Sequence, residues 1–260
     1  METDSKTYDL LPPYEPDDGP SSNALEPTVL VLAGQSIHAE TATSAPLYQM
    51  SRSVISPTPK QDGTSVTFER IEHSVPEKVE GTASAKPRTQ LLFYLAHPVN
   101  AEYRKDTPAY FITAASPQMV GNIVFETSKS VIQKTEFKAL LSANRTASDK
   151  PLFDEKAEPL FNIKPKWKGG GHKWTGPDGT QVALEEGKGA EHKLAITAPM
   201  EREMRDALVA MWVLRLWHDT AETRQAKREV LESMTPISAY SDMKLAKRAG
   251  ALSGIAGGAC

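Results

Sequence analysis

The sequence predicts a mainly β domain with some α structure: an antiparallel β-barrel wrapped around one buried hydrophobic helix near the C-terminal side. Two observations predict this fold class. Between Thr28 and Pro199, many runs of strand length follow one another, each bounded by Gly, Pro, Asn or Asp. After them, every residue from Ala207 to Trp217 is apolar except Arg215. A helix without a polar face is buried on all sides, and the preceding strands are the structure available to enclose it.

The expected strands are the short apolar or alternating runs of the first two hundred residues. In chain order they are TVLVLAG, APLYQMSRSVI, TSVTFERIEH, QLLFYLAHP, AYFITAA, VGNIVFET, PLFDEKAEPLFNIKP, HKWTGPDGTQVALEEG and HKLAITAP. Within the eighth run, Asp178-Gly179 is a strong signal for a tight hairpin turn. Two stretches rich in polar residues and proline, 56–63 and 75–89, are interpreted as linkers.

The expected helix covers about residues 199–218. Thr197 is a plausible N-cap, and Glu201 and Glu203 lie in the first turn, where the helix dipole favours acids. His218 is expected at the helix end, where a positive charge suits the dipole. Burial of one large apolar side chain contributes roughly 1.5–3 kcal/mol, so the helix is expected to be a main source of stability. The side chains expected to fill the barrel are Leu208, Met211, Trp212, Leu214 and Leu216.

The chain divides into three parts. Residues 1–27 carry five prolines among acids and serines, a composition that predicts a disordered tail. Residues 28–218 form the barrel domain with its central helix. Residues 219–260 are predicted to be exposed helices that run into a small, Gly-rich flexible end.

Composition excludes several classes of protein. The 260 residues carry a net charge of -3, which argues against a nucleic-acid partner. One cysteine, Cys260, cannot form an internal disulfide. The acidic, polar start of the chain lacks the apolar run of a signal peptide, and no apolar run reaches the roughly 18 residues of a transmembrane segment. We therefore expect a cytoplasmic protein, peripheral where it meets a membrane.

Four segments carry a resemblance to a known family: SAPLYQMSRSV, PLFDEKAEPLFNI, HKWTGPDGTQVALEE and DALVAMWVLRLWHD. Their order resembles the tubby C-terminal-like superfamily, which includes tubby-like proteins, phospholipid scramblases and LURP-one-related proteins, and it looks most like fungal members of that group. The resemblance covers about residues 28–218 and implies a barrel around a central helix. Some tubby-like proteins bind phosphoinositides through basic residues, and scramblases are linked to membranes and calcium. No calcium loop or phosphoinositide pocket of the family aligns with this chain residue by residue.

A basic segment, NIKPKWKGGGHKWTG at residues 162–176, combines four lysines and two tryptophans without an acid. Lysines near an anionic membrane contribute on the order of 1 kcal/mol each. One interpretation is therefore contact with anionic phospholipid headgroups; the other is a hairpin turn with solvated lysines and one Trp in the core. The residues assigned to lipid binding are Lys164, Lys166, Trp167, Lys168 and Lys173.

The Pro-rich tail contains Leu11-Pro12-Pro13-Tyr14. It resembles the LPxY variant of the PY motif that WW domains bind, including those of ubiquitin ligases. A Pro-rich segment is already extended and loses little entropy on binding. The alternative is an ordinary Pro-rich tail.

No catalytic signature accompanies these features. The sequence has no Gly-x-Ser-x-Gly elbow and no HExxH, and Cys260 is expected to be an exposed thiol. The adjacent pair Glu185-Glu186 ends a strand and is expected to be solvated. The six histidines are scattered, without the spacing of a metal site: His38, His73, His97, His172, His192 and His218.

The sequence therefore predicts a non-enzymatic binding or adaptor domain without catalytic residues, metal or cofactor. The first hypothesis is association with anionic phospholipid. The second is a protein–protein adaptor that recruits a WW-domain partner. A third, weaker one is a scramblase-like or lipid-carrier activity with its pocket in the barrel.

Overall fold

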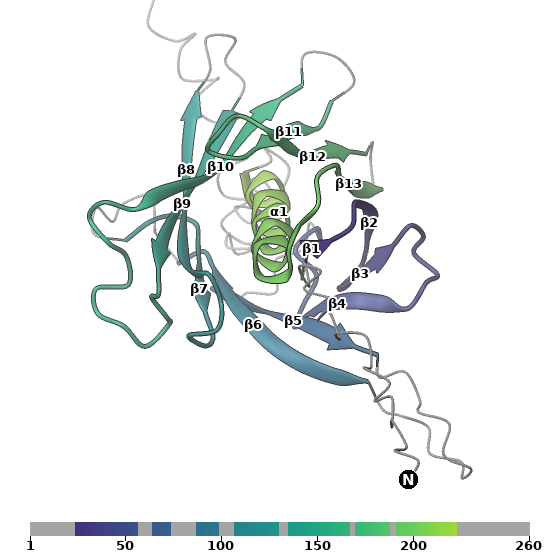
Figure 1. Ribbon diagram of the computed structural model, residues 1–260, viewed down its shortest axis with the longest axis horizontal. Helices are drawn as coiled ribbons and strands as arrows, with labels where there is room; N and C mark the ends of the chain where they lie inside the picture. Colours follow the sequence, from purple (N-terminus) through teal and green to yellow (C-terminus); the bar gives the residue numbers. More distant parts are fainter. Residues whose placement is uncertain are drawn as a thin grey trace, which may run out of the picture.

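The computed structural model describes residues 24–56, 64–73, 87–98, 107–129, 135–166, 170–187 and 191–222. In this part of the chain, twelve antiparallel strands close into a barrel in the order β10-β11-β12-β13-β2-β3-β4-β5-β6-β7-β8-β9, and β1 pairs with β14 in a separate two-stranded sheet (Figure 1). The strands are β1 Ala24–Leu25, β2 Thr28–Ala33, β3 Ser36–Ala39, β4 Pro46–Met50, β5 Ser65–Glu72, β6 Arg88–Ala96, β7 Phe111–Ala114, β8 Gly121–Lys129, β9 Thr135–Ala143, β10 Glu158–Pro165, β11 His172–Thr175, β12 Gln181–Glu186, β13 His192–Ile196 and β14 Met200–Glu201.

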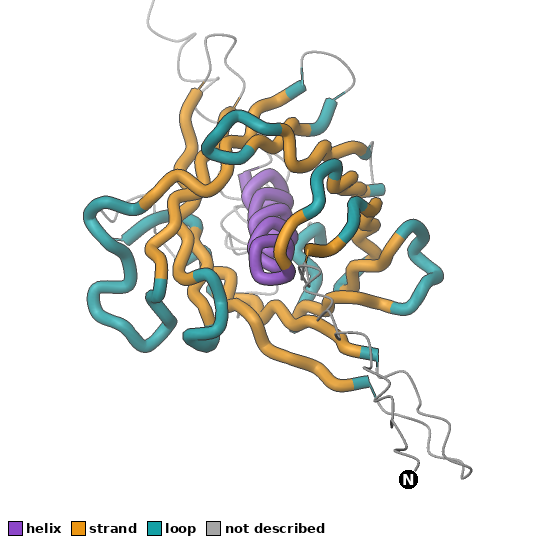
Figure 2. Tube along the Cα trace, in the orientation of Figure 1, coloured by secondary structure: helices purple, strands orange, loops and turns teal. Residues whose placement is uncertain are grey.

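The helix α1, Arg202–Glu222, runs through the middle of the ring of strands (Figures 1 and 2). Every residue from Arg205 to Trp217 is buried, which confirms a helix without a solvent face inside a closed β shell. The five side chains expected to fill the barrel are all at most 2% exposed. The predicted fold class is therefore the observed one.

The bounds of this helix differ from the expected ones. It begins at Arg202, because Met200–Glu201 instead form β14 and pair with β1. Thr197 is not its N-cap, since the Thr197 hydroxyl donates a hydrogen bond to the Gln181 carbonyl, 3.3 Å away. The helix continues past His218 to Glu222, four residues beyond its expected end.

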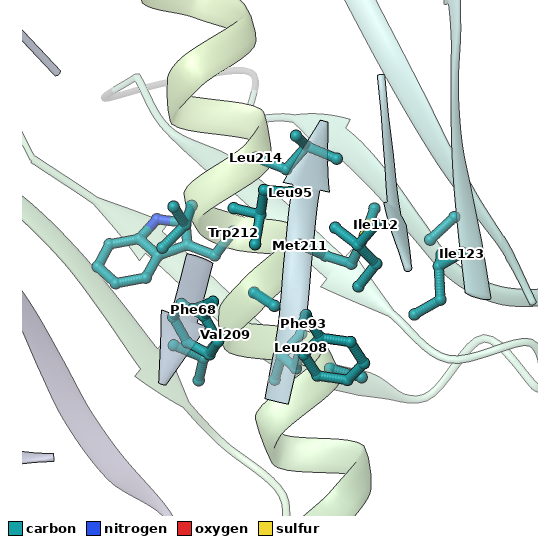
Figure 3. Packing of buried hydrophobic residues seen from close by; sticks show 14 of the residues in the cluster. Phe68, Phe93, Leu95, Ile112, Ile123, Leu208, Val209, Met211, Trp212 and Leu214 are labelled. Atoms are coloured by element: carbon teal, nitrogen blue, oxygen red, sulfur yellow. The ribbon is translucent and has the colours of Figure 1, made fainter. Parts of the chain in front are cut away.

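Side chains from the helix and from the wall meet in one apolar core (Figure 3). Trp212 lies near the middle of the helix and is fully buried. The wall contributes residues from several consecutive strands, so the helix is held from more than one side. The labelled members are Phe68 of β5, Phe93 and Leu95 of β6, Ile112 of β7, Ile123 of β8, and Leu208, Val209, Met211, Trp212 and Leu214 of α1.

All nine expected runs contain a strand, but two further barrel strands, β3 and β9, were not predicted. The linker expected at 75–89 is too long at its C-terminal end, since Arg88 and Thr89 pair with β5. The Asp178-Gly179 turn is confirmed: the Gly179 amide donates to the Gly176 carbonyl (3.0 Å), and Gly179 has a φ of 83°. Positive φ explains glycine at this position.

Candidate functional site at one end of the barrel

The basic segment folds as the hairpin between β10 and β11, which we call the basic hairpin. Lys164 lies directly opposite Lys173, and Ile163 lies opposite Trp174. Because side chains alternate along a strand, Ile163 and Trp174 point into the core, where neither is exposed, and both lysines lie on the exposed outer face. Like charges directly opposite each other on neighbouring strands are unfavourable, so the two lysines raise the local positive potential at a cost in stability.

The lysines of the basic hairpin differ in their partners. The Lys166 ammonium lies 3.4 Å from the exposed Glu186 carboxylate, a surface ion pair of small energetic value. Within the described ranges, Lys164 and Lys173 form no ion pair with an acid. Trp167 and Lys168 lie outside the described residues. The structure thus places Trp174 in the core, as the interpretation of an ordinary hairpin turn expects, and places Lys164 and Lys173 side by side on the outer face.

Beneath the basic hairpin lies a buried charged network. Glu185 was expected to be solvated, but it is only 4% exposed, because alternation along β12 turns it inward and leaves Glu186 outside. Arg215 of α1 donates hydrogen bonds to the Glu185 carboxylate and to Asp219, the latter at 2.6 Å. His172 Nδ1 lies 3.5 Å from the second Glu185 oxygen. The network joins β11, β12 and the C-terminal half of α1.

A series of aromatic contacts connects this charged network to the end of β6 on the other side of the barrel. The rings of His218 and His172 both meet Phe137 edge-on, with centroids 5.0 and 5.7 Å away. His218 also lies 4.9 Å from the Tyr110 ring, and Tyr110 stacks on His97 at 4.1 Å. A continuous row of rings therefore links the ends of β6, β9 and β11 to the helix.

A fourth histidine, His192 at the start of β13, belongs to the same network. Burial lowers its pKa, while the charge of Glu185 opposes this shift. The charges of Arg215 and Asp219 on α1 also affect the pKa of His192, the first lowering it and the second raising it. We call His97, His172, His192 and His218 the histidine cluster. A signal for this cluster is present in the sequence: three of its members lie at the ends of expected strands, and the fourth lies at the expected helix end.

The cluster also fixes the charge state of Asp219. Burial acts to raise the pKa of Asp219, but hydrogen bonding with His218 and the charge of Arg215 outweigh it and bring the pKa to about 2. In the parts of the chain that the structure describes, no group of three or more His, Cys, Asp or Glu side chains could hold a metal ion. The arrangement is a network of ion pairs and histidine side chains.

The opposite end of the barrel holds α1 by a second buried network. Asp206 is fully buried, accepts a hydrogen bond from the Tyr48 hydroxyl at 2.9 Å and pairs with Arg70. Arg70 also donates to Gln90 at 2.6 Å. Burial raises the pKa of Asp206 to about 6, against the charge of Arg70. The pKa of Tyr48 is raised by its burial and by the neighbouring Asp206.

Comparison with protein-family models, with curated proteins and with solved structures gave no match. Within the described part of the chain, no helix is both long enough and apolar enough to cross a bilayer. The Leu11-Pro12-Pro13-Tyr14 motif lies outside the described residues, so recruitment of a WW-domain partner stays a prediction from sequence.

Proposed function

We propose that this chain is a non-enzymatic binding domain of tubby-like fold that associates peripherally with anionic phospholipid through the basic hairpin. The tubby-like assignment is supported by the closed barrel and its central C-terminal helix, the arrangement that the sequence resemblance implies. The single observation that carries the lipid assignment is the pair Lys164 and Lys173, opposed on the outer face without an acidic partner among the described residues.

The physical argument starts from the repulsion between these two ammonium groups. Opposed residues of an antiparallel pair have Cβ atoms about 4.5–5.5 Å apart, so the two charges are close together. An anionic phosphate placed between or above them removes the repulsion and adds attraction of on the order of 1 kcal/mol per lysine. An anionic surface thus supplies the negative charge that the two lysines lack among the described residues.

The filled barrel favours surface binding over the carrier hypothesis. A carrier needs an interior in which an acyl chain can lie, yet α1 occupies the middle of this barrel and thirteen consecutive residues of the helix are buried there. A lipid inside the barrel would have to displace Trp212 and its neighbours from a densely packed core. The outer face of the hairpin needs no such displacement.

Co-sedimentation with vesicles over a salt series tests the proposal. Vesicles of phosphatidylcholine with phosphatidylserine, with and without phosphoinositide, are expected to bind the wild-type protein at low salt and to release it at high salt, because surface charges are screened. Loss of two lysine contacts of about 1 kcal/mol each corresponds to roughly 10- to 30-fold weaker binding. The variant that removes them is Lys164→Gln/Lys173→Gln.

A matched control removes the same charge from elsewhere. Lys150 and Lys156 are exposed in the loop between β9 and β10, at the end of β10 away from the basic hairpin. Lys150→Gln/Lys156→Gln is expected to bind nearly as well as the wild type. Absence of wild-type binding at low salt, or equal weakening by both double substitutions, would overturn the lipid assignment.

A further inference from the structure

The basic hairpin and the histidine cluster share one end of the barrel. His172 precedes Lys173 on β11, and the Lys166 amide donates a hydrogen bond to the Gly171 carbonyl, at 3.0 Å, to close the hairpin. From there, the ring contacts of Phe137 and Tyr110 lead through His218 to His97. Four of the six histidines of the chain therefore lie at the end that carries the proposed lipid contact.

At neutral pH, most charges of this end neutralise one another. Lys166 pairs with Glu186, and Lys193 pairs with Glu191 at 2.8 Å. Arg215 pairs with two carboxylates, Glu185 and Asp219, which leaves one negative charge in excess in this buried network. Of the lysines described on the basic hairpin, Lys164 and Lys173 are left to set the positive potential. A positive charge added to the histidines would therefore change the net charge of this end of the barrel by a large fraction.

Histidine is the side chain whose charge changes between about pH 5 and 8. We propose that proton uptake by the histidine cluster strengthens binding of this barrel end to anionic membranes, so that association rises from neutral to mildly acidic pH. The inference rests on the proposed function and adds its regulation. The chain carries a net charge of -3 with neutral histidines, and protonation of all six makes it positive.

The surroundings of each histidine can accept the added charge. His172 faces Glu185 of β12, whose other carboxylate oxygen pairs with Arg215 of α1. His218 is 3.4 Å from Asp219 of its own helix and meets the rings of Tyr110 and Phe137. In both cases a carboxylate is the nearest titratable group, so a charged imidazole replaces a polar contact with an ion pair.

The other two members have different neighbours. Burial lowers the pKa of His192, and the charges of Glu185 and Asp219 oppose this shift, so His192 takes up a proton at lower pH than an ordinary imidazole. His97 Nδ1 donates a hydrogen bond to the Ala109 carbonyl, 2.7 Å away, and the His97 ring contacts the rings of Tyr110 and Trp217. On the same side, the Arg52 guanidinium lies over the Trp217 ring, 4.6 Å from its centroid.

The test is co-sedimentation of the full chain with phosphatidylcholine/phosphatidylserine vesicles at pH 7.5 and 5.5, at one ionic strength. Each positive charge gained near the surface strengthens binding about fivefold, so two or more give at least a tenfold increase at pH 5.5. Pure phosphatidylcholine vesicles are expected to bind no better at pH 5.5 than at pH 7.5. The triple variant His172→Gln/His192→Gln/His218→Gln is expected to lose most of the pH response.

The matched control is His38→Gln/His73→Gln. His73 follows β5 at the Asp206 end of the barrel, and His38 lies on β3, away from the basic hairpin. This variant is expected to keep the pH response, and equal loss of the response in control and triple variant would overturn the inference. If the triple variant fails to fold by thermal melting, the wild-type salt dependence decides: a steeper slope at pH 5.5 supports added charge contacts, and equal slopes overturn them.

The outcomes separate the two proposals. Lysine-dependent binding of equal strength at both pH values would overturn the pH regulation and leave the lipid function standing. Lack of binding to every anionic vesicle at both pH values would overturn the lipid function itself, and the regulation with it.

Discussion

The two ends of α1 are anchored by buried charges of opposite sign. Near its start, Asp206 is an anion held by Tyr48 and Arg70 of the barrel wall. In its C-terminal half, Arg215 is a cation held by Glu185 of the wall and by Asp219. The signs follow the helix dipole, which favours anions toward the N-terminus and cations toward the C-terminus. An otherwise apolar helix is thus fixed in depth and direction inside the barrel.

The two aspartates of these networks show what decides the charge state of a paired acid. Each has an arginine partner, yet the pKa of Asp206 is raised to about 6 and that of Asp219 is lowered to about 2. Asp206 is fully buried, whereas the Asp219 side chain is 49% exposed. Full burial therefore decides the pKa of Asp206, whereas at the less buried Asp219 the hydrogen bond with His218 and the charge of Arg215 outweigh the effect of burial.

The largest effect is expected from Trp212→Asp, which disrupts the buried apolar part of α1 between the two charged networks. The substitution places an unpaired charge in the middle of a fully buried helix, and such burial costs more than the net stability of a typical domain can absorb. We expect loss of the cooperative unfolding transition, measured by circular dichroism. Trp212→Phe is the control, since the indole N–H of Trp212 has no hydrogen-bond partner to lose among the described residues. A soluble, cooperatively folded Trp212→Asp variant would contradict the central-helix architecture.

A smaller effect is expected from removal of one ion-pair partner. Arg215→Met leaves Glu185 buried without its cation, which costs about 3–5 kcal/mol of unfolding free energy in comparable pairs. Arg70→Met is expected to cost less, because Arg70 is partly exposed and Asp206, with its raised pKa, can take up a proton. Urea unfolding at pH 7 measures both. The double variant Arg215→Met/Glu185→Leu is expected to recover part of the loss, and equal losses at the two ends would contradict the comparison.

The smallest effects are the pH dependences of the two aspartates, which have opposite signs. Because the Asp206 pKa is raised from 3.8 to about 6, the folded state binds the extra proton, and the contribution of this group falls as pH rises from about 4 to 6. The change is on the order of 2–3 kcal/mol. The Asp219 contribution is complete above pH 4 and falls as pH drops toward 2.

Asp206→Asn and Asp219→Asn isolate these two contributions in urea unfolding at each pH. The unfolding free energy of the wild type minus that of Asp206→Asn is expected to fall as pH rises from 4 to 6. The unfolding free energy of the wild type minus that of Asp219→Asn is expected to rise as pH rises from 2 to 4, by a smaller amount, because Asp219 is half exposed. Parallel curves for the two variants would mean that both carboxylates sit in equivalent surroundings.

The central helix could be predicted from sequence because its apolar residues surround the whole helix, a pattern with one structural solution. Strand β9, TEFKALLSA, could not be predicted in the same way. Its Glu, Lys, Ala and Leu residues favour helix locally, and it is held as a strand by pairing with β8 and β10. Strand β3 was missed because it has four residues and only Ile37 is fully buried.

The charged site was harder to predict than the fold. Glu185 and Glu186 are chemically identical neighbours, and which one turns inward depends on the register of β12, which the sequence leaves open. The histidines lie far apart along the chain, and they meet because the closed strand order brings the ends of β6, β11 and β13 to one end of the barrel. The opposition of Lys164 and Lys173 likewise depends on the register of the pairing between β10 and β11.

The closure of the barrel has a consequence for how the chain reaches this structure. The last barrel pairing joins β13 to β2, segments near opposite ends of the domain, and the helix that fills the interior comes later still. Contacts between distant segments slow folding, because the intervening loop must be ordered before they form. During synthesis, the strands leave the ribosome before their core exists and expose their apolar inner faces. The domain is therefore expected to complete folding only after α1 has been made, and to need protection from aggregation until then.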